Sequence, residues 1–340
     1  MIPGLAADFS GYADDIFPSV PALSRWLGRS RRMAFPCVDV DSAACALFGL
    51  EAGQPPVAAL GYLADFSELP AGHCFRLDPV HLRADTSGLV LFAAESAGIS
   101  EEEGRALFEA VRPWLEKDGW TMRYAAADRW YVSNTMSVPV LVTHSLTQVA
   151  GQPISGCLPK GEGADDWLRR INELQMILHR HDVNQHRGSQ GRPLVSGLWL
   201  WGGGLMPAPG KAGCSQIQTT RSVLSGLASL HGVSSVSVMT DAGSLPADEG
   251  HFLIDIDACE PAAASGDVQH WCSQLEQLER DWFVPLLRAL MRGTIQQLEL
   301  LPLNGFRYPL RRLDLLAFWR GRLSGDLRSQ LSVAKGQRPQ

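Results

Sequence analysis

Residues 195–205 read Val-Ser-Gly-Leu-Trp-Leu-Trp-Gly-Gly-Gly-Leu, and this stretch constrains the fold more than any other part of the sequence. Its central residues 198–201 are large and apolar at every position, which is typical of a β-strand covered on both faces. The three glycines at 202–204 end the apolar run. We therefore predict a buried strand whose two leucines and two tryptophans belong to the core.

Two helices are indicated before this strand. Ser100 is followed three residues later by Glu103, a capping-box pattern, and apolar residues recur at helical spacing from 107 to 115. The same periodicity predicts a second helix over 165–181, which ends before the polar stretch 186–191. The capping box makes the first helix the better defined of the two.

The first helix lies within a group of four predicted strands. Alternating apolar residues and the turn residues between them place these strands at 74–84, 89–92, 120–124 and 129–132. Strand, strand, helix, strand, strand is the order of a compact α+β module. We expect this module to be an inserted α+β domain spanning residues 66–150.

Strands and helices alternate in the C-terminal half of the chain. The predicted order is a helix near 223–230, strands at 233–239 and 251–256, a helix near 268–290 and strands at 295–301 and 306–310. This alternation predicts an α/β core with a mostly parallel sheet and helices on both faces. We assign this core to residues 1–65 and 151–325, followed by a flexible tail over 326–340.

Composition narrows the class of function. The net charge of −6 and a pI near 5.9 do not fit a surface that neutralises nucleic-acid phosphates, so we expect no nucleic-acid partner. The seven cysteines are scattered without metal-ligand spacing, which is typical of reduced thiols in the cytoplasm. No apolar run approaches the roughly 20 residues of a membrane span. We therefore expect a cytoplasmic protein with no membrane partner.

Several stretches, in the same order along the chain, resemble the archaeal type of cofactor-independent phosphoglycerate mutase. They are residues 74–85, 97–103, 158–161, 181–187, 191–193, 198–204, 225–228 and 236–243. The Leu-Trp-Leu-Trp-Gly-Gly-Gly signature and the closing segment 306–319 look still more like RpfE-type bacterial regulatory proteins, which are regarded as relatives of those mutases. The resemblance implies a truncated alkaline-phosphatase-like fold.

Motifs that this resemblance would imply are missing. Members of the alkaline-phosphatase superfamily use two metal ions and, in the mutases, a serine nucleophile. The N-terminal residues supply neither the family's Asp-Gly metal ligand nor its Ser-Asp-Thr nucleophile segment. The family's Asp-x-x-Gly-His-x-x-Asp should fall near residues 257–267, which read Asp-Ala-Cys-Glu-Pro-Ala-Ala-Ala-Ser-Gly-Asp without a histidine. The active site is therefore expected to be degenerate.

Two groups of residues are candidates for a binding site. The candidates for binding an anion are Asn184, Arg187, Gly202, Gly203, Gly204, Arg76 and Arg129. Arginine offers forked donors and a glycine loop exposes backbone N–H groups, and both suit phosphate or carboxylate. Asp255 and Asp257 alternate on a predicted strand and are expected to point to one side, at the carboxyl end of a parallel sheet. Structural packing is the alternative for both groups.

Two stretches that contain histidine are weaker candidates for a metal site. His179, His181, Asp182 and His186 are close in sequence, but residues two apart do not share a helix face. Solvation of the carbonyl groups at a helix end is the favoured interpretation of these side chains. Residues 248–251 precede their strand instead of following it, which is typical of a solvated turn. The sequence thus predicts no metal and no cofactor.

Three functions follow from these patterns. The leading hypothesis is a non-catalytic or regulatory relative of the mutases that binds an acidic or phosphorylated metabolite. The first alternative is a metal-dependent phosphoryl-transfer enzyme, a mutase or a phosphatase, that uses Asp255, Asp257 and histidines from elsewhere in the fold. The second alternative is a protein-interaction module with a protein partner, suggested by the tryptophan and arginine content of residues 313–322.

Overall fold

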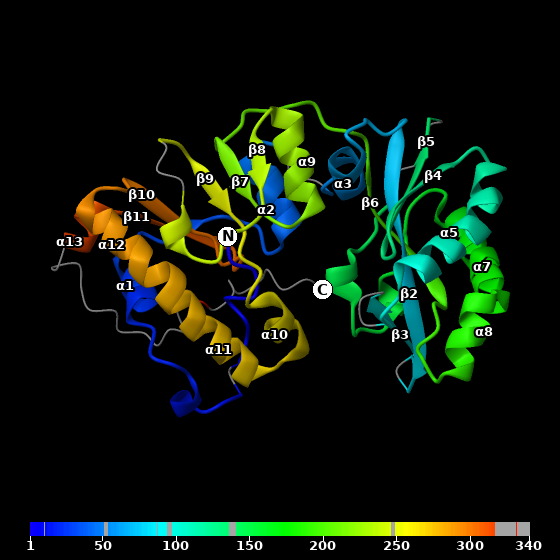
Figure 1. Cartoon of the computed structure of the whole chain (residues 1–340), viewed down its shortest axis with the longest axis horizontal. Helices are drawn as coiled ribbons and strands as arrows, with labels where there is room; N and C mark the ends of the chain where they lie inside the picture. The colour runs from blue at the N-terminus through cyan, green and yellow to red at the C-terminus, as the bar shows by residue number, and fades with distance from the viewer. Residues whose placement is uncertain are drawn as a thin grey trace. The chain divides into compact units, whose positions relative to one another are not determined.

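The computed structural model describes residues 1–9, 11–50, 54–86, 88–93, 97–135, 141–245, 249–316 and 331. Contacts between residues divide the chain into two compact units (Figure 1). Unit 1 takes its described residues from 1–49, 211–221 and 232–340, and unit 2 from 50–210 and 222–231. The domain boundaries expected from sequence stay a prediction. In the described part of the chain no helix is long and apolar enough to cross a membrane.

A five-stranded antiparallel sheet is the centre of unit 2. Its strands are β2 (His73–Asp85), β3 (Gly88–Ala93), β4 (Thr121–Ala126), β5 (Arg129–Asn134) and β6 (Gly197–Gly204). The 13-residue β2 is long enough to pair with β5 near its start and β3 near its end, while β6 pairs with its middle. Every strand of this sheet therefore depends, directly or through β5, on β2.

Helices cover both faces of this sheet. The helices of unit 2 are α3 (Val57–Phe66), α5 (Glu101–Glu116), α6 (Leu146–Val149), α7 (Ala164–Arg180), α8 (Asp182–Ser189) and α9 (Ser222–His231). Phe75, Leu198 and Leu200 pack in a core with α5 and α7, whereas Cys74 packs with α3. Trp199 and Trp201 are also buried. The strand predicted from residues 195–205 and its burial are confirmed.

The two helices predicted in this region are confirmed. α5 begins with a full capping box, in which Glu103 N donates to Ser100 Oγ (3.2 Å) and Ser100 N donates to Glu103 Oε2 (2.9 Å). α7 follows the predicted periodicity. The polar stretch after it is not a simple helix end, because residues 182–189 form the separate helix α8.

Unit 1 contains two small sheets and a helical layer. Its strands are β1 (Met33–Ala34), β7 (Gln216–Gln218), β8 (Ser234–Val236), β9 (Phe252–Ile254), β10 (Gln297–Leu300) and β11 (Phe306–Arg311). Its helices are α1 (Pro21–Arg29), α2 (Val40–Leu47), α10 (Glu260–Ser265), α11 (Val268–Leu278), α12 (Val284–Arg292) and α13 (Arg312–Leu316). β8, β7 and β9 are parallel in that order, and β1, β11 and β10 are antiparallel.

A π-helical turn joins α11 to α12 and supports α1. The turn spans Glu279–Phe283 and makes the predicted long helix nearly continuous. α1 has no side-chain cap of its own, and the buried Glu279 carboxylate accepts hydrogen bonds from Ala22 N (2.5 Å) and Leu23 N (3.0 Å). A carboxylate at a helix N-terminus satisfies free N–H groups and the positive end of the helix dipole.

The mixed α/β class is confirmed, but the prediction of a mostly parallel sheet is not, because the sheets are mainly antiparallel. Only β8, β7 and β9 form parallel pairs among the described strands. Alternation of strands and helices predicts parallel pairing only when successive strands join one sheet. Here β2 pairs with β6, more than 100 residues later, in the antiparallel sense. The predicted tail lies outside the described residues except for Leu331.

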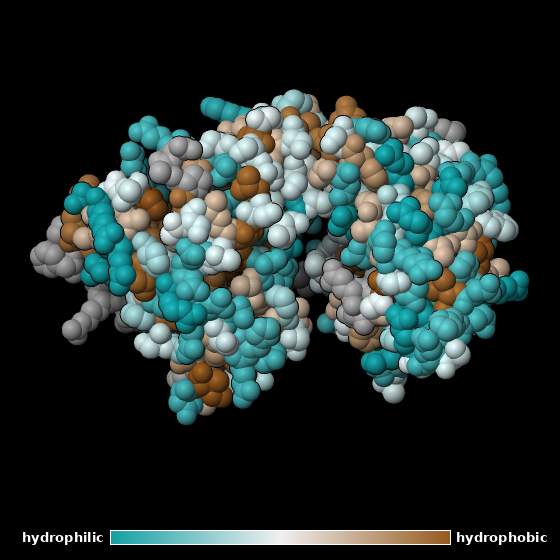
Figure 2. All heavy atoms as spheres, in the orientation of Figure 1, coloured by the Kyte–Doolittle hydropathy of each residue, from teal (hydrophilic) through white to brown (hydrophobic). Residues whose placement is uncertain are grey.

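Exposed large apolar side chains come from separate elements, as with Leu69, Met176, Leu205 and Leu313. On the face drawn in Figure 2, apolar residues form small areas between polar ones. Scattered exposure of this kind is normal for a folded protein.

The contact between α3 and α9 gives a prediction about stability. A Cβ added to Gly226 would lie 1.9 Å from the backbone oxygen of Leu60, so the two helices would have to separate. We expect Gly226→Ala to lower the free energy of unfolding by about 1–3 kcal/mol. Urea denaturation followed by circular dichroism measures this loss. Gly156→Ala is the control, since nothing lies within 4 Å of its added Cβ, and equal stability of the two variants would contradict the packing.

Candidate functional site

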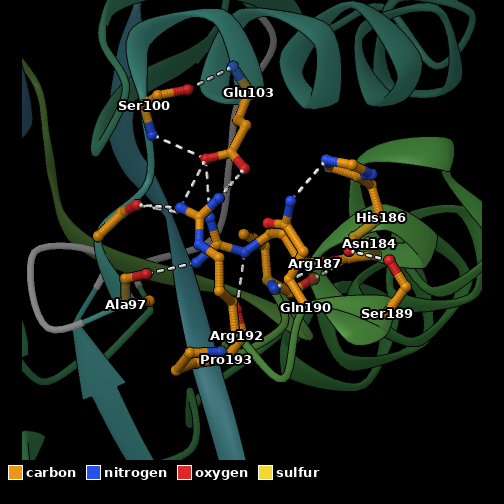
Figure 3. Close-up of polar contacts among 12 residues, drawn as sticks. Ala97, Ser100, Glu103, Asn184, His186, Arg187, Ser189, Gln190, Arg192 and Pro193 are labelled. Carbon is orange, nitrogen blue, oxygen red and sulfur yellow. Dashed lines mark hydrogen bonds and ion pairs between the residues drawn. The ribbon is translucent and has the colours of Figure 1, made fainter.

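The guanidinium of Arg187 is buried and donates to groups of the protein itself (Figure 3). Its Nε donates to Pro193 O (2.7 Å), its Nη1 to Glu103 Oε2 (2.7 Å) and its Nη2 to Ala97 O. Arg192 Nη1 donates to the other oxygen of Glu103 (3.0 Å). These bonds tie α8 to the start of α5, so the structure places Arg187 as a structural connection.

Glu103 is the shared acceptor of this cluster. Its side chain is only 15% exposed, and burial raises its pKa. Hydrogen bonds from Ser100 N and Arg187, with the charges of Arg187 and Arg192, outweigh that effect and hold the pKa below its ordinary value of 4.5. The carboxylate is therefore charged throughout the neutral range.

Asn184 is held in a similar way. Its Nδ2 donates to Leu178 O (2.7 Å) and Val195 O (2.9 Å), and its Oδ1 accepts from Val195 N (2.9 Å). The amide thus joins the end of α7 to the segment that leads into β6. Asn184 and Arg187 both lie on α8, but they bind different parts of the protein.

The three glycines expected to form a ligand loop are part of β6. A Cβ on Gly203 would lie 2.1 Å from Phe75 Cε1, and one on Gly204 would lie 2.8 Å from Pro56 Cβ. Gly202 has φ +65° and faces Val57. The absence of side chains therefore lets the strand pack against neighbouring residues.

Arg76 and Arg129 lie on neighbouring strands of the same sheet. Arg76 makes a buried two-pronged ion pair with Asp78 (2.8 Å for both bonds), which also accepts from Trp201 Nε1 (2.7 Å). Arg129 Nε donates to Asp65 Oδ2 at 2.8 Å, and its side chain is 31% exposed. Of the candidate arginines, Arg129 therefore remains the most accessible to a ligand.

Asp255 and Asp257 have different surroundings. Asp255 follows β9 and is buried, whereas Asp257 is exposed. Parallel β7 and β9 end side by side, which places Thr219 next to Asp255. Asp255 Oδ2 accepts from Thr219 Oγ1 (3.1 Å) and Arg221 Nε (2.9 Å). The carboxyl edge of this parallel sheet therefore carries a polar cluster, as is common in α/β folds.

Arg221 also donates to Glu260, so one guanidinium joins two carboxylates. Burial lowers the pKa of Arg221, but the charges of Asp255 and Glu260 outweigh burial and raise it above its ordinary value. Thr219, Arg221 and Glu260 are not among the site residues predicted from the sequence. The available signals were a Thr-Thr-Arg sequence after a short strand and a Glu-Pro helix start, and neither is specific.

Two buried oxygen atoms at this edge lack a hydrogen-bond donor among the described residues. They are Asp255 Oδ1 and Gln218 Oε1, which belong to neighbouring strand ends. A buried acceptor without a donor costs about 1–3 kcal/mol, so such atoms commonly indicate water or an ion. The part of the chain that the structure describes contains no group of three or more histidine, cysteine, aspartate or glutamate residues that could hold a metal.

No protein-family model matches the chain. It is 30% identical over 176 residues to a probable 2,3-bisphosphoglycerate-independent phosphoglycerate mutase of Geobacter sulfurreducens, over 49% of this chain and 43% of that protein. It is 27% identical over 221 residues to 2,3-bisphosphoglycerate-independent phosphoglycerate mutase 2 of Methanothermobacter thermautotrophicus, over 56% of this chain and 53% of that protein. The chain spans about half the length of the curated relatives it matches.

Two solved structures are similar to the chain. A cofactor-independent phosphoglycerate mutase from Thermoplasma acidophilum matches with a TM-score of 0.42 and 16% identity, over 86% of this chain and 81% of that one. The PH0037 protein from Pyrococcus horikoshii matches with a TM-score of 0.49 and 13% identity, over 86% and 79%. The sequence relatives agree with the resemblance to cofactor-independent mutases noted from the motifs.

The Arg187 cluster predicts a pH-dependent contribution to stability. Because the pKa of Glu103 is lower in the folded state, its carboxylate stabilises the fold above the ordinary value of 4.5. That contribution is lost as the pH falls below 4.5 and through the folded-state pKa. We expect Glu103→Gln to lower the free energy of unfolding by roughly 1 kcal/mol at pH 7. Below the folded-state pKa of Glu103 the substitution should change it by almost nothing, because the wild-type carboxyl group is then also neutral.

Urea denaturation at a series of pH values measures this difference. Glu109→Gln is the matched control, because Glu109 is an exposed residue of the same helix that pairs with Arg112. It should change the free energy of unfolding by less than about 0.5 kcal/mol. A cost for Glu103→Gln that does not vary with pH would contradict the lowered pKa.

Proposed function

We propose that this protein is a regulatory, non-catalytic relative of the cofactor-independent phosphoglycerate mutases that binds an acidic or phosphorylated metabolite. One observation carries the non-catalytic part. Arg221 joins Asp255 and Glu260 at the carboxyl edge of the parallel sheet. Its positive charge lies between two carboxylates, so their negative charge is already compensated without a metal ion.

The groups at this edge do not fit a pair of divalent metal ions. A metal ion would lie beside a guanidinium, and the two positive charges would repel each other. Asp255 Oδ1 and Gln218 Oε1 are the buried oxygens there without a donor among the described residues, fewer than the three protein ligands usual at a catalytic zinc site. This donor set supports loss of the metal-dependent reaction.

The nearest thiol is not an activated nucleophile. Cys259 is buried immediately before α10, and burial raises its pKa to about 12. A thiol with that pKa is protonated at neutral pH, and the thiolate is the reactive form. The missing serine motif and the neutral thiol together support a site without covalent catalysis.

The resemblance to RpfE-type regulatory proteins belongs to this proposal. The Leu-Trp-Leu-Trp-Gly-Gly-Gly signature that carries it forms the buried strand β6, which supports a structural role for the signature. Arg129 is the candidate residue best placed to meet a metabolite, because Arg187 and Asn184 already bind protein groups.

A metal-dependent phosphoryl-transfer enzyme remains the second candidate function. The observation that favours it is the buried Asp255 Oδ1, which lacks a hydrogen-bond donor among the described residues. Fewer observations support a protein-interaction module, because residues 317–322 lie outside the described residues. Within the described part of 313–322, Leu313 and Leu316 are exposed.

Metal binding separates the first two functions. Wild-type protein is expected to show no rise in melting temperature with Mn²⁺, Zn²⁺ or Mg²⁺, and no mutase or phosphatase activity with these ions. Arg221→Ala should lose roughly 3 kcal/mol of stability, because Asp255 and Glu260 then lose the guanidinium that pairs with both. Divalent ions should restore part of that loss, since they replace the missing charge.

Arg25→Ala is the matched control, since Arg25 is an exposed arginine of α1 in the same unit. It should leave both stability and the response to metals unchanged. Stabilisation of the wild-type protein by a divalent ion, together with metal-dependent turnover of a phosphorylated substrate, would overturn the non-catalytic proposal.

A further inference from the structure

A groove of about 360 Å³ lies along α7 in unit 2. Asn172, Gln175, Met176, His179 and Arg180 line it from the helix. Their spacing of three, four, seven and eight residues places them on one face of α7. Leu174 and Leu178 are buried in the core, so this polar face is directed away from the apolar contacts of the helix.

The polar side chains of this face are not used by the described part of the protein. Asn172, Gln175, His179 and Arg180 have no side-chain hydrogen bond or ion pair with any described residue. Other arginines of α7 are paired, as with Arg169, which binds Asp166 at 3.2 Å. A row of unused donors and acceptors in a groove is what a polar ligand requires.

The floor of the groove is already ordered. The side chains of Asn184 and Ser196 form part of its lining. Asn184 holds Leu178 O and Val195 as described above, and Ser196 Oγ accepts from Leu82 N (2.8 Å). Hydrogen bonds of this kind fix the groove before a ligand arrives, which reduces the entropy lost on binding.

Two carbonyl groups in the last turn of α7, those of Leu178 and His179, already accept hydrogen bonds. Asn184 Nδ2 and His181 N both donate to Leu178 O, and Gln185 Nε2 donates to His179 O at 3.4 Å. These bonds reduce the negative potential expected at a helix C-terminus. The charge of Arg180 is therefore available to a ligand.

The chemistry of the lining identifies a class of ligand. Arg180 offers a forked donor set that suits carboxylate or phosphate, and His179 adds a second nitrogen donor. The amides of Asn172 and Gln175 can each donate and accept, which suits hydroxyl groups. The volume is at the small end of the range for small-molecule sites. Met176 and Leu194 add an apolar surface to the lining, which suits the carbon skeleton of a metabolite.

We propose that this groove binds a small acidic metabolite, with Arg180 and His179 on its carboxylate or phosphate and Asn172 and Gln175 on its hydroxyl groups. The proposal rests on the metabolite-binding part of the proposed function, and it assigns the binding to residues of unit 2, whereas the Asp255 cluster belongs to unit 1. Asn172, His179 and Arg180 are exposed and Gln175 is half-buried, so we expect these four side chains to be replaceable without loss of the fold.

Titration calorimetry of the full chain tests the site with three probes: glycerol 3-phosphate, malate and inorganic phosphate. Glycerol 3-phosphate and malate distinguish a phosphate from a carboxylate as the recognised group. We expect one of these two to bind once per chain and more tightly than inorganic phosphate. Arg180→Gln should weaken that binding by about 10-fold or more, and Asn172→Ala with Gln175→Ala by a smaller factor.

Arg169→Gln is the control, because Arg169 is an exposed arginine on the same helix whose charge already pairs with Asp166. It should leave the affinity unchanged. Failure of all three probes to bind at about 10 mM, a concentration that would nearly saturate a site with a Kd of about 1 mM, or equal affinities of the wild-type and Arg180→Gln proteins, would overturn the proposal. Metal-dependent turnover would overturn only the non-catalytic function, because the groove variants leave Asp255 and Arg221 intact.

Discussion

A buried carboxylate at the end of a parallel strand needs a compensating cation, and in this protein Arg221 provides it. Asp255 is almost completely buried, and the cost of removing its charge from water would be large without a partner. The guanidinium meets that need and also reaches Glu260. These bonds occupy Asp255 Oδ2 and Glu260 Oε2 and place a positive charge beside both carboxylates, which disfavours a divalent ion there. The structure of the edge and the proposed loss of metal chemistry therefore have one cause.

Charged side chains that are buried in unit 2 also have partners of opposite charge. Arg187 with Glu103, and Arg76 with Asp78, are buried pairs whose hydrogen bonds end on other parts of the same unit. A buried ion pair stabilises the fold only modestly. Removing one partner lowers the free energy of unfolding by more, because the other charge is then buried without compensation. The effect of these pairs is to fix the positions of α5, α8 and β2. Asn172, Gln175, His179 and Arg180 in the groove on α7 differ, because their side chains have no such partner among the described residues.

Local patterns in the sequence predicted much of the secondary structure. The capping box of Ser100 and Glu103, the apolar run at 198–201 and the periodicity of 165–181 each depend on neighbours in the chain, and each is confirmed. Strand direction was predicted less well, because β2 and β6 meet through a pairing distant in sequence. The role of Arg221 could not be predicted, since its partners come from residues 34 and 39 positions away. Arginine and glycine residues can bind phosphate, but they also form internal ion pairs and close backbone contacts. The sequence alone does not distinguish these two roles.

The most direct test of the central claim is a crystal structure of the protein grown with Mn²⁺ and measured at an X-ray energy where manganese scatters anomalously. The account predicts the Arg221 guanidinium between Asp255 and Glu260, with no anomalous peak at this edge of the sheet. A manganese peak within coordination distance of Asp255 Oδ1, with Arg221 displaced, would contradict it.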